Sequence, residues 1–345
     1  MPEPTVEVSR RYHQIPNKNN ANGIWSLNEV YQARLSEHWG SNRWQGNRGV
    51  LGGGYSGSYQ NDMEYFSIRN LTNGKYFGDL SNSTYLNPAG SSGLGGRILF
   101  VGGYQALANI DYIATACCGN AMDFGDVAVA AGGGDLYSHG VGSNGYRMWM
   151  SSGKAAGTDD QAGKLTIDTT ANATNYMDMS AGFAATGVSG RYRGFSVGGK
   201  DSSNMRAQID YFTIMSDSNA ADFGNLSTAR RYGTGTTNGY KIVVACGEDN
   251  SATLQSMEHF NVDTSANADS TVTTSAGNNT GGIRNRTCNM DHDDFSIFTG
   301  TTSVHNVSSL DYMNIASHAT WTADAQMGQV TGTTARSGGG GASGG

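Results

Sequence analysis

The stretch Ile209-Asp210-Tyr211-Phe212-Thr213-Ile214 recurs along this chain about every 50 residues. Each clear copy alternates apolar, acidic and aromatic residues, a pattern that is typical of a β-strand. The other clear copies are residues 63–68, 110–115, 257–262 and 310–315, and residues 165–167 are a degenerate copy. Fixed-period similarity of this length indicates an array of similar supersecondary units.

Each copy also contains further shared parts. A short apolar stretch that ends in glycines comes first, as in Leu99-Phe100-Val101-Gly102-Gly103, and a turn rich in Asn, Ala, Asp and Gly follows the acid–aromatic strand. Short strands with regular turn signals and no helical periodicity indicate an all-β propeller, and this repeat length is of the kelch type. We therefore predict about six four-stranded blades in residues 49–345.

The last copy is short and ends in the glycine-rich residues 338–345, so it lacks an obvious fourth strand. Closing a propeller removes exposed sheet edges. We expect the strand in residues 49–54 to complete the last blade and latch the ring.

Composition supports a packed protein and excludes some partners. The chain has 50 Gly, but its 17 Tyr and 11 Phe recur at repeated places, which favours packed blades over disorder. The net charge is −7 and no basic patch occurs, which argues against binding to nucleic acid. No apolar run reaches membrane-spanning length, and the N-terminus lacks the apolar core of a signal peptide. We expect no membrane partner and synthesis in a cytoplasm.

Residues 1–48 differ from the repeats. The first 23 residues are polar and contain three prolines, whereas residues 24–35 predict a short helix with a capping box from Ser26 to Glu29. Two interpretations are open: the helix packs on its own propeller, or the arm and helix dock on a neighbouring subunit. The polar arm favours docking as an anchor. The predicted partner-binding residues of this anchor helix are Trp25, Leu27, Val30, Tyr31 and Leu35.

The recurring acids are the first candidates for chemistry. They could form a ring that binds a cation or supplies paired acids. Alternatively, each could accept hydrogen bonds from a turn of the neighbouring blade. Regular recurrence favours the structural role, because an acid–base pair needs two carboxylates with different pKa values. These acids are Glu64, Asp111, Asp210, Glu258 and Asp311.

Other candidates favour a structural protein too. The cluster Asp291-His292-Asp293-Asp294 lacks the glycine and distal glutamate of an EF-hand and predicts a solvated loop. We expect the cysteines at 117, 118, 246 and 288 to be small buried side chains, since no zinc-ligand spacing occurs. We predict no catalytic residue, cofactor or metal site, and no enzyme activity.

Two turn motifs of the repeat are nearly identical. They are Asn120-Ala121-Met122-Asp123-Phe124-Gly125-Asp126 and Asn219-Ala220-Ala221-Asp222-Phe223-Gly224-Asn225. Together with the double glycines, the acid–aromatic strands and the Gly23–Tyr31 segment, these motifs resemble those of kelch-like repeat virion structural proteins of tailed bacteriophages, notably phages of cyanobacteria and marine bacteria.

The resemblance implies a non-enzymatic component of a virion, in a tail fibre, a tail tip or a capsid-surface appendage. Its partners would be other virion subunits, in multiple copies per particle, with a host surface glycan or protein as a further partner. A soluble carbohydrate-binding, lectin-like propeller is the alternative, and a propeller enzyme is a third hypothesis.

Overall fold

The computed structural model describes residues 48–55, 57–68, 74–84, 89–93, 96–103, 108–127, 140–151, 161–179, 185–201, 204–252, 254, 256–273, 290–292, 295–299, 310–315 and 340–344. The chain divides into two units, Met1–Arg43 and Trp44–Gly345, and all described residues belong to the second. None of the described residues is helical. The predicted helix in residues 24–35 lies outside them.

The described residues form antiparallel strands in six sheets. From inner to outer strand, these sheets are β23 (Gly340–Gly344), β1 (Arg48–Gly52), β2 (Gln60–Ser67) and β3 (Lys75–Thr84); β4 (Ala89–Ser92), β5 (Arg97–Val101), β6 (Asn109–Ala114) and β7 (Met122–Asp126); β8 (Val141–Ser143), β9 (Arg147–Ser151), β10 (Gln161–Thr166) and β11 (Thr174–Asp178); β12 (Thr186–Ser189), β13 (Arg193–Val197), β14 (Gln208–Thr213) and β15 (Ala221–Asn225); β16 (Thr234–Thr237), β17 (Lys241–Ala245), β18 (Ser256–Asn261) and β19 (Asp269–Thr273); and β20 (Met290–His292), β21 (Phe295–Thr299) and β22 (Leu310–Asn314). We call the five four-stranded sheets blades 1 to 5 in this order.

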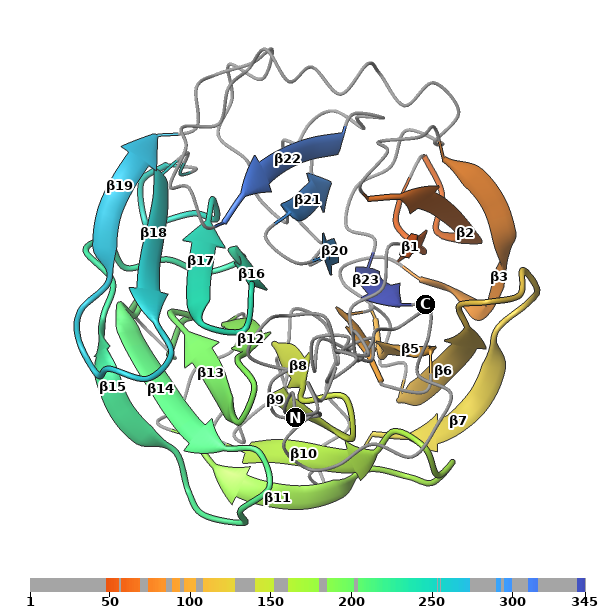
Figure 1. Cartoon of the computed structure of the whole chain (residues 1–345), viewed down its shortest axis with the longest axis horizontal. Helices are drawn as coiled ribbons and strands as arrows, with labels where there is room; N and C mark the ends of the chain where they lie inside the picture. The colour runs from red at the N-terminus through yellow and green to blue at the C-terminus, as the bar shows by residue number, and fades with distance from the viewer. Residues whose placement is uncertain are drawn as a thin grey trace, which may run out of the picture. The chain divides into compact units, whose positions relative to one another are not determined.

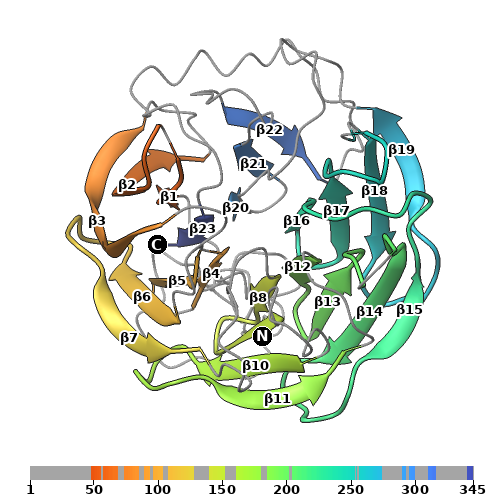
Figure 2. The ribbon, with the colours of Figure 1, turned by 180° about the vertical axis from the view of Figure 1, so that it is seen from behind.

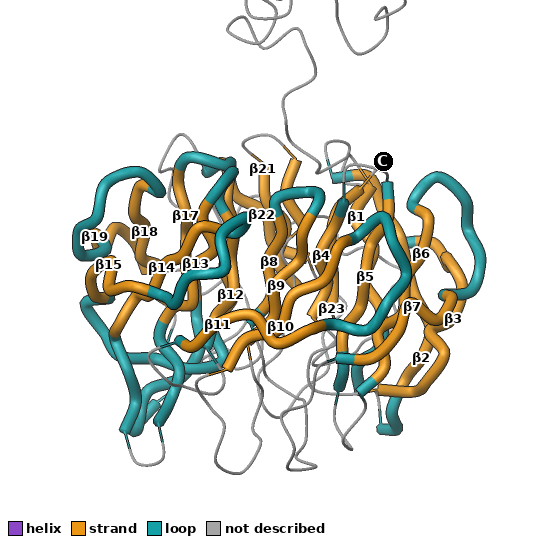
Figure 3. Tube along the Cα trace, turned by 90° about the horizontal axis from the view of Figure 1, so that it is seen from below, coloured by secondary structure: helices purple, strands orange, loops and turns teal. Residues whose placement is uncertain are grey.

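The sheets stand around one axis as a β-propeller (Figures 1 and 2). The inner strands contact one another in the cyclic order β23, β4, β8, β12, β16, β20 and back to β23. In the side view, the strands run between two rims of loops (Figure 3). The prediction of an all-β propeller is confirmed, with five complete blades and a sixth sheet of three described strands.

The strand that closes the ring differs from the prediction. The C-terminal strand β23 pairs with β1, with Gly341 opposite Leu51, and so completes blade 1. The expectation that residues 49–54 complete the last blade is therefore wrong. Crowding near the axis explains why a glycine-rich tail suits this place. On the inner strand β12, a Cβ added to Gly187 would lie only 2.2 Å from the backbone nitrogen of Val141 on β8.

The hydrophobic core lies between the blades. One cluster joins Leu99 and Phe124 of blade 2 to Met148 and Leu165 of blade 3. A second packs Phe223 of blade 4 against Ile242, Val244 and Phe260 of blade 5. Phe124 and Phe223 are buried, whereas the tyrosines of the acid–aromatic strands at 65, 112 and 211 are only partly buried. A single blade cannot bury both of its apolar faces, so the neighbouring blade is part of its fold.

The Asn-Ala pair of each turn binds the outer strand of the preceding blade, and we call this contact the Asn–Ala clamp. The Asn219 side chain accepts a hydrogen bond from Asp178 N–H (3.2 Å), while Ala220 N–H donates to the carbonyl of Asp178 (3.0 Å). The clamp recurs in three further joints, with Asn120-Ala121 on Asp79, Asn172-Ala173 on Asp126, and Asn267-Ala268 on Asn225.

The glycine of the Phe-Gly motif makes room for this clamp. Gly224 has a φ of +155°, and a Cβ there would lie 2.3 Å from the carbonyl oxygen of Ala266 in the next blade. Gly78 and Gly125 meet the following blade in the same way. The motif therefore combines a core aromatic residue, a glycine that allows backbone contact, and a residue whose backbone is clamped.

An arginine at the start of the second strand supplies another joint. Arg97 donates to the carbonyl of Ile167 in the next blade (2.9 Å), and its guanidinium lies 4.9 Å from the ring centre of Tyr112 in its own blade. Arg48 and Arg193 repeat both contacts. Stacking on tyrosine orients each guanidinium toward the neighbouring blade.

Truncation after residue 339 should destabilise the ring, because it removes β23. Each backbone hydrogen bond contributes about 0.5–1.5 kcal/mol net, so losing the pairing with β1 should cost about 3 kcal/mol. Chemical denaturation checks this value, and deletion of Gly345 alone is the control, since it leaves β23 intact. Equal stability of both variants would contradict the latch.

Candidate functional site

The sequence-predicted anchor residues lie outside the described residues. These are Trp25, Leu27, Val30, Tyr31 and Leu35. Their role as a partner-binding helix stays a prediction.

The recurring acids occupy one register position on the third strand of their sheets. Glu64, Asp111, Asp210 and Glu258 are each at most 7% exposed. Because two strands separate them from the axis, they do not line it. Their side chains are therefore removed from solvent on the sides where blades pack.

Two of these acids bind the preceding blade, as the structural interpretation predicted. Asp111 accepts hydrogen bonds from Ser81 N–H (2.8 Å) and from the Ser81 hydroxyl (2.7 Å). Glu258 accepts one from Ser227 N–H (2.5 Å). A carboxylate buried in this way is stabilised by the donors around it. For Asp111 and Glu258, the hydrogen bond to a neighbouring blade is confirmed, although Ser81, the partner of Asp111, lies in strand β3 and not in a turn.

The joint between blades 4 and 5 adds a buried ion pair. Arg230 and Glu258 are both fully buried, and the guanidinium donates to the carboxylate. Arg230 also donates to the carbonyls of Cys246 (3.1 Å) and Ser256 (2.9 Å). The Nε of Arg230 donates to the carbonyl of Thr228 (3.4 Å), so every nitrogen of the guanidinium has a partner, and those of the two terminal nitrogens belong to blade 5. Loss of one partner of such a pair costs about 3–5 kcal/mol, because the other charge stays buried.

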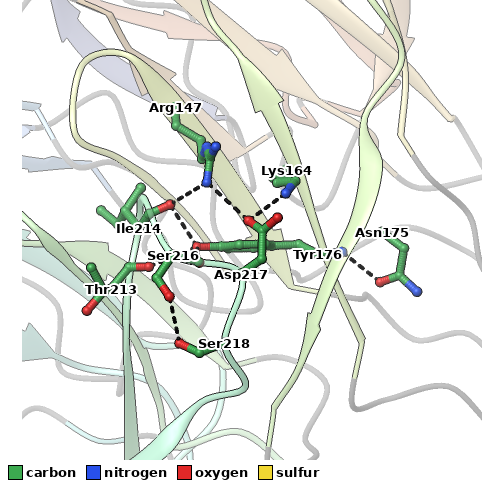
Figure 4. A network of polar contacts seen from close by, with 9 residues as sticks. All are labelled: Arg147, Lys164, Asn175, Tyr176, Thr213, Ile214, Ser216, Asp217 and Ser218. Carbon is green, nitrogen blue, oxygen red and sulfur yellow. Dashed lines mark hydrogen bonds and ion pairs between the residues drawn. The ribbon is translucent and has the colours of Figure 1, made fainter.

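The joint between blades 3 and 4 is built differently (Figure 4). Lys164 replaces the repeat tyrosine, and Tyr176 replaces the phenylalanine of the outer strand. The Tyr176 ring lies 5.0 Å from the Lys164 ammonium, and its hydroxyl lies 2.5–3.0 Å from three carbonyl oxygens of blade 4, which belong to residues 213, 214 and 216. The cation–aromatic contact is retained although the aromatic residue has moved one strand outward.

Asp217 completes this network. Its carboxylate lies 2.6 Å from the Lys164 ammonium and 3.3 Å from the Arg147 guanidinium. The pKa of Asp217 is lowered, chiefly by the hydrogen bond from Lys164, and the pKa of Tyr176 is raised above 10, chiefly by burial. The side chain of Asp217 is 61% exposed, so the network lies at the surface. Its ion pairs therefore add little stability.

A row of exposed tyrosines is the clearest unexplained feature. Tyr146, Tyr192 and Tyr240 are 57%, 68% and 48% exposed. Each lies in the tight turn between the first and second strands of its blade, in blades 3, 4 and 5. Equivalent turns of an up-and-down propeller open on the same face, so the three rings belong to one rim. Exposed aromatic residues at equivalent places form a candidate interaction surface.

Other sequence candidates have mixed outcomes. Cys246 is buried as expected, but Cys117 and Cys118 are exposed because they lie at the tip of the β6–β7 turn. Asp291 and His292 lie in β20, while residues 293, 294 and 288 are outside the described part. Within the described ranges, no three His, Cys, Asp or Glu side chains group as metal ligands, and no helix could span a membrane.

Sequence reasoning missed the tyrosine row and the buried Arg230. A signal for the row was present, since Asn-Gly-Tyr at 144–146, Gly-Arg-Tyr at 190–192 and Asn-Gly-Tyr at 238–240 occupy the same place in successive copies. No local signal marks Arg230 as buried, because its partners Cys246, Ser256 and Glu258 lie in the next blade.

No protein-family model matches the chain, and a search of curated proteins gives no match.

Asp111→Asn should destabilise the fold by about 1–3 kcal/mol, because it weakens charge-assisted hydrogen bonds in a buried site. Asp126→Asn is the matched control: the clamp binds the backbone of Asp126, and blade 4 carries Asn225 at this place. Urea denaturation of both variants and of Ser81→Ala checks the prediction. Equal effects of the Asp111 and Asp126 substitutions would contradict the blade-joining role.

Tyr176 should make stability fall at alkaline pH. Its raised pKa means that the folded state favours the neutral phenol. The resulting stabilisation is present below the unfolded pKa of about 10 and is lost as pH rises through the folded pKa. Tyr176→Phe should lose about 1 kcal/mol at neutral pH and show a smaller fall above pH 10 than the wild type. Denaturation across pH 7–11.5 tests this, with Tyr146→Phe as the exposed control; identical pH dependence of wild type and Tyr176→Phe would refute it.

Proposed function

We propose that this chain is a non-enzymatic structural and interaction protein of a phage particle, in a tail fibre, a tail tip or a capsid-surface appendage. Residues 1–48 attach it to other virion subunits, and the kelch-like propeller offers a surface for host or subunit contacts. The protein is present in multiple copies in the virion. No cofactor, nucleic acid or membrane takes part.

The observation that carries the non-enzymatic part is the use of the repeat acids in blade joints. Asp111 and Glu258 are the kind of carboxylate that a propeller enzyme could employ, yet both are buried and bind the preceding blade. Arg230, another buried charge, is held by Glu258 and by backbone carbonyls. Charges that are satisfied by the fold serve its stability.

The blade count belongs to the same proposal. We infer about six blades, in agreement with the repeat length. Strands β20, β21 and β22 pair in the same order as the first three strands of each other blade, and β20 contacts both β16 and β23. The sixth sheet thus fills the interval between blades 5 and 1.

A soluble carbohydrate-binding propeller is the second candidate, and the exposed Tyr146, Tyr192 and Tyr240 favour it. Fractionation separates the two candidates. A virion component sediments with intact particles in a density gradient, whereas a free lectin stays in the soluble fraction. Recovery of the protein only in the soluble fraction would reject the virion role.

Deleting residues 1–44 should leave melting unchanged but abolish incorporation into the particle. The deletion spares β1, which begins at Arg48, so the ring keeps the strand that pairs with β23. The polar arm has too little apolar surface to order itself alone, which suits a segment that folds on a partner. Thermal melting and quantitative immunoblotting of purified particles give the two readouts.

Leu27→Ala combined with Tyr31→Ala in the full chain is the matched variant, since it keeps the arm and removes part of the predicted apolar face. It should lose incorporation as the deletion does. Normal incorporation of the truncated chain would defeat the anchor, and its unfolding would show that residues 1–44 belong to the propeller core.

A further inference from the structure

Arg191 is the one described arginine whose guanidinium donates no hydrogen bond to another described residue. The others each bind a carbonyl, a carboxylate or an amide oxygen, and they are Arg48, Arg97, Arg147, Arg193, Arg206, Arg230 and Arg231. The Nε atom of Arg191 is buried and has no hydrogen-bond partner. A guanidinium strongly favours a planar acceptor with two oxygens, so the unused N–H donors of Arg191 point to a ligand.

The position of Arg191 is fixed by the next blade. Its guanidinium carbon lies 4.4 Å from the ring centre of Tyr240. Gly239, the residue before Tyr240, has a φ of +89° and lies against the same side chain, since a Cβ there would be in ordinary contact, 3.6 Å, with Cγ and Nε of Arg191. The arginine therefore bridges the β12–β13 and β16–β17 turns. Stacking on Tyr240 holds the guanidinium in place without using the N–H groups of its two terminal nitrogens.

Rigid turns hold the three tyrosines. Asn144 accepts hydrogen bonds from Tyr146 N–H (3.1 Å) and Arg147 N–H (2.9 Å), and Asn238 does the same for Tyr240 (3.1 Å) and Lys241 (2.8 Å). In the third turn, which carries Tyr192, Gly190 N–H donates a hydrogen bond to the carbonyl of Arg193 (2.9 Å). Fixed turns lower the entropy cost of binding through these rings.

The chemistry around the rings favours a sugar over a protein. The turns contain only Asn, Gly, Arg and Tyr between their strands, so the turns themselves supply no aliphatic side chain beside the aromatic rings. A protein hot spot requires a packed apolar centre that excludes water, which the residues of these turns do not supply. Separate aromatic platforms beside a fixed guanidinium match a chain of sugar rings that carry carboxylates.

We propose that Tyr146, Arg191, Tyr192 and Tyr240 form a binding surface for a carboxylated polysaccharide. Sugar rings stack on the exposed tyrosines, and a carboxylate takes the terminal nitrogens of Arg191. This inference deepens the proposed function by naming the class of glycan, and it rests on the propeller being an interaction module. Polysaccharide binding is measured on the purified protein, so the result is independent of particle incorporation.

The test measures binding of the full chain to polygalacturonate, alginate and hyaluronan by calorimetry at low salt. We expect at least one of them to bind, and its affinity to fall by about tenfold or more for Arg191→Gln and for Tyr192→Ala. Lys75→Gln is the control for charge and Tyr76→Ala the control for an exposed tyrosine, since both lie on the outer strand β3 and should leave affinity unchanged. Melting temperatures establish that each variant is folded.

A second measurement uses the wild type alone, so that it does not depend on any variant. Methyl esterification of the bound polysaccharide should remove binding to the same extent as Arg191→Gln, because it removes the carboxylate. The proposal is overturned if none of the three polysaccharides binds, if the ester binds equally well, or if only dextran sulfate or a protein partner depends on Arg191. Loss of glycan binding with normal particle incorporation would separate this inference from the virion role.

Discussion

The packing of each blade on its neighbour is the constraint on which this structure depends. A four-stranded blade has two apolar faces, and both are covered only when the preceding and the following blade are in place. The cores around Phe124 and Phe223 accordingly combine residues of two blades. A propeller of this kind is stable as a closed ring, and the pairing of β23 with β1 completes blade 1.

Polar contacts set the spacing of the blades. The Asn–Ala clamp binds the backbone of one residue through both its N–H and its carbonyl, so it specifies register as well as distance. Arg97 and its equivalents add a side chain that crosses the joint. Because the clamp recognises backbone, the clamped residue varies between Asp and Asn without loss of the contact.

The joint between blades 3 and 4 shows how far the repeat can vary. Moving the aromatic residue from the third strand to the fourth, as Tyr176, keeps a cation above an aromatic ring and adds hydrogen bonds to blade 4. The network in Figure 4 is therefore a variant of the repeated joint, and its perturbed pKa values arise from burial and ion pairing within the fold. Perturbed titration alone does not identify a functional site when a structural network explains it.

Sequence alone was sufficient for the all-β propeller, because a repeat near 50 residues carries the strand pattern in every copy and needs no long-range information. It also indicated hydrogen bonds from the recurring acids to a neighbouring blade, which Asp111 and Glu258 form. Only the tertiary structure decided which end of the chain closes the ring, since a run such as Gly340–Gly344 has no strand signal of its own and becomes a strand by pairing with β1, far away along the chain. The environments of Arg191 and Arg230 were likewise set by neighbouring blades. Arg191 stacks on Tyr240 and leaves its guanidinium N–H groups without a described acceptor, whereas Arg230 pairs with Glu258 and its guanidinium nitrogens all have acceptors. Both are arginines in polar turns of the sequence, and their difference arises from contacts between residues that are far apart along the chain.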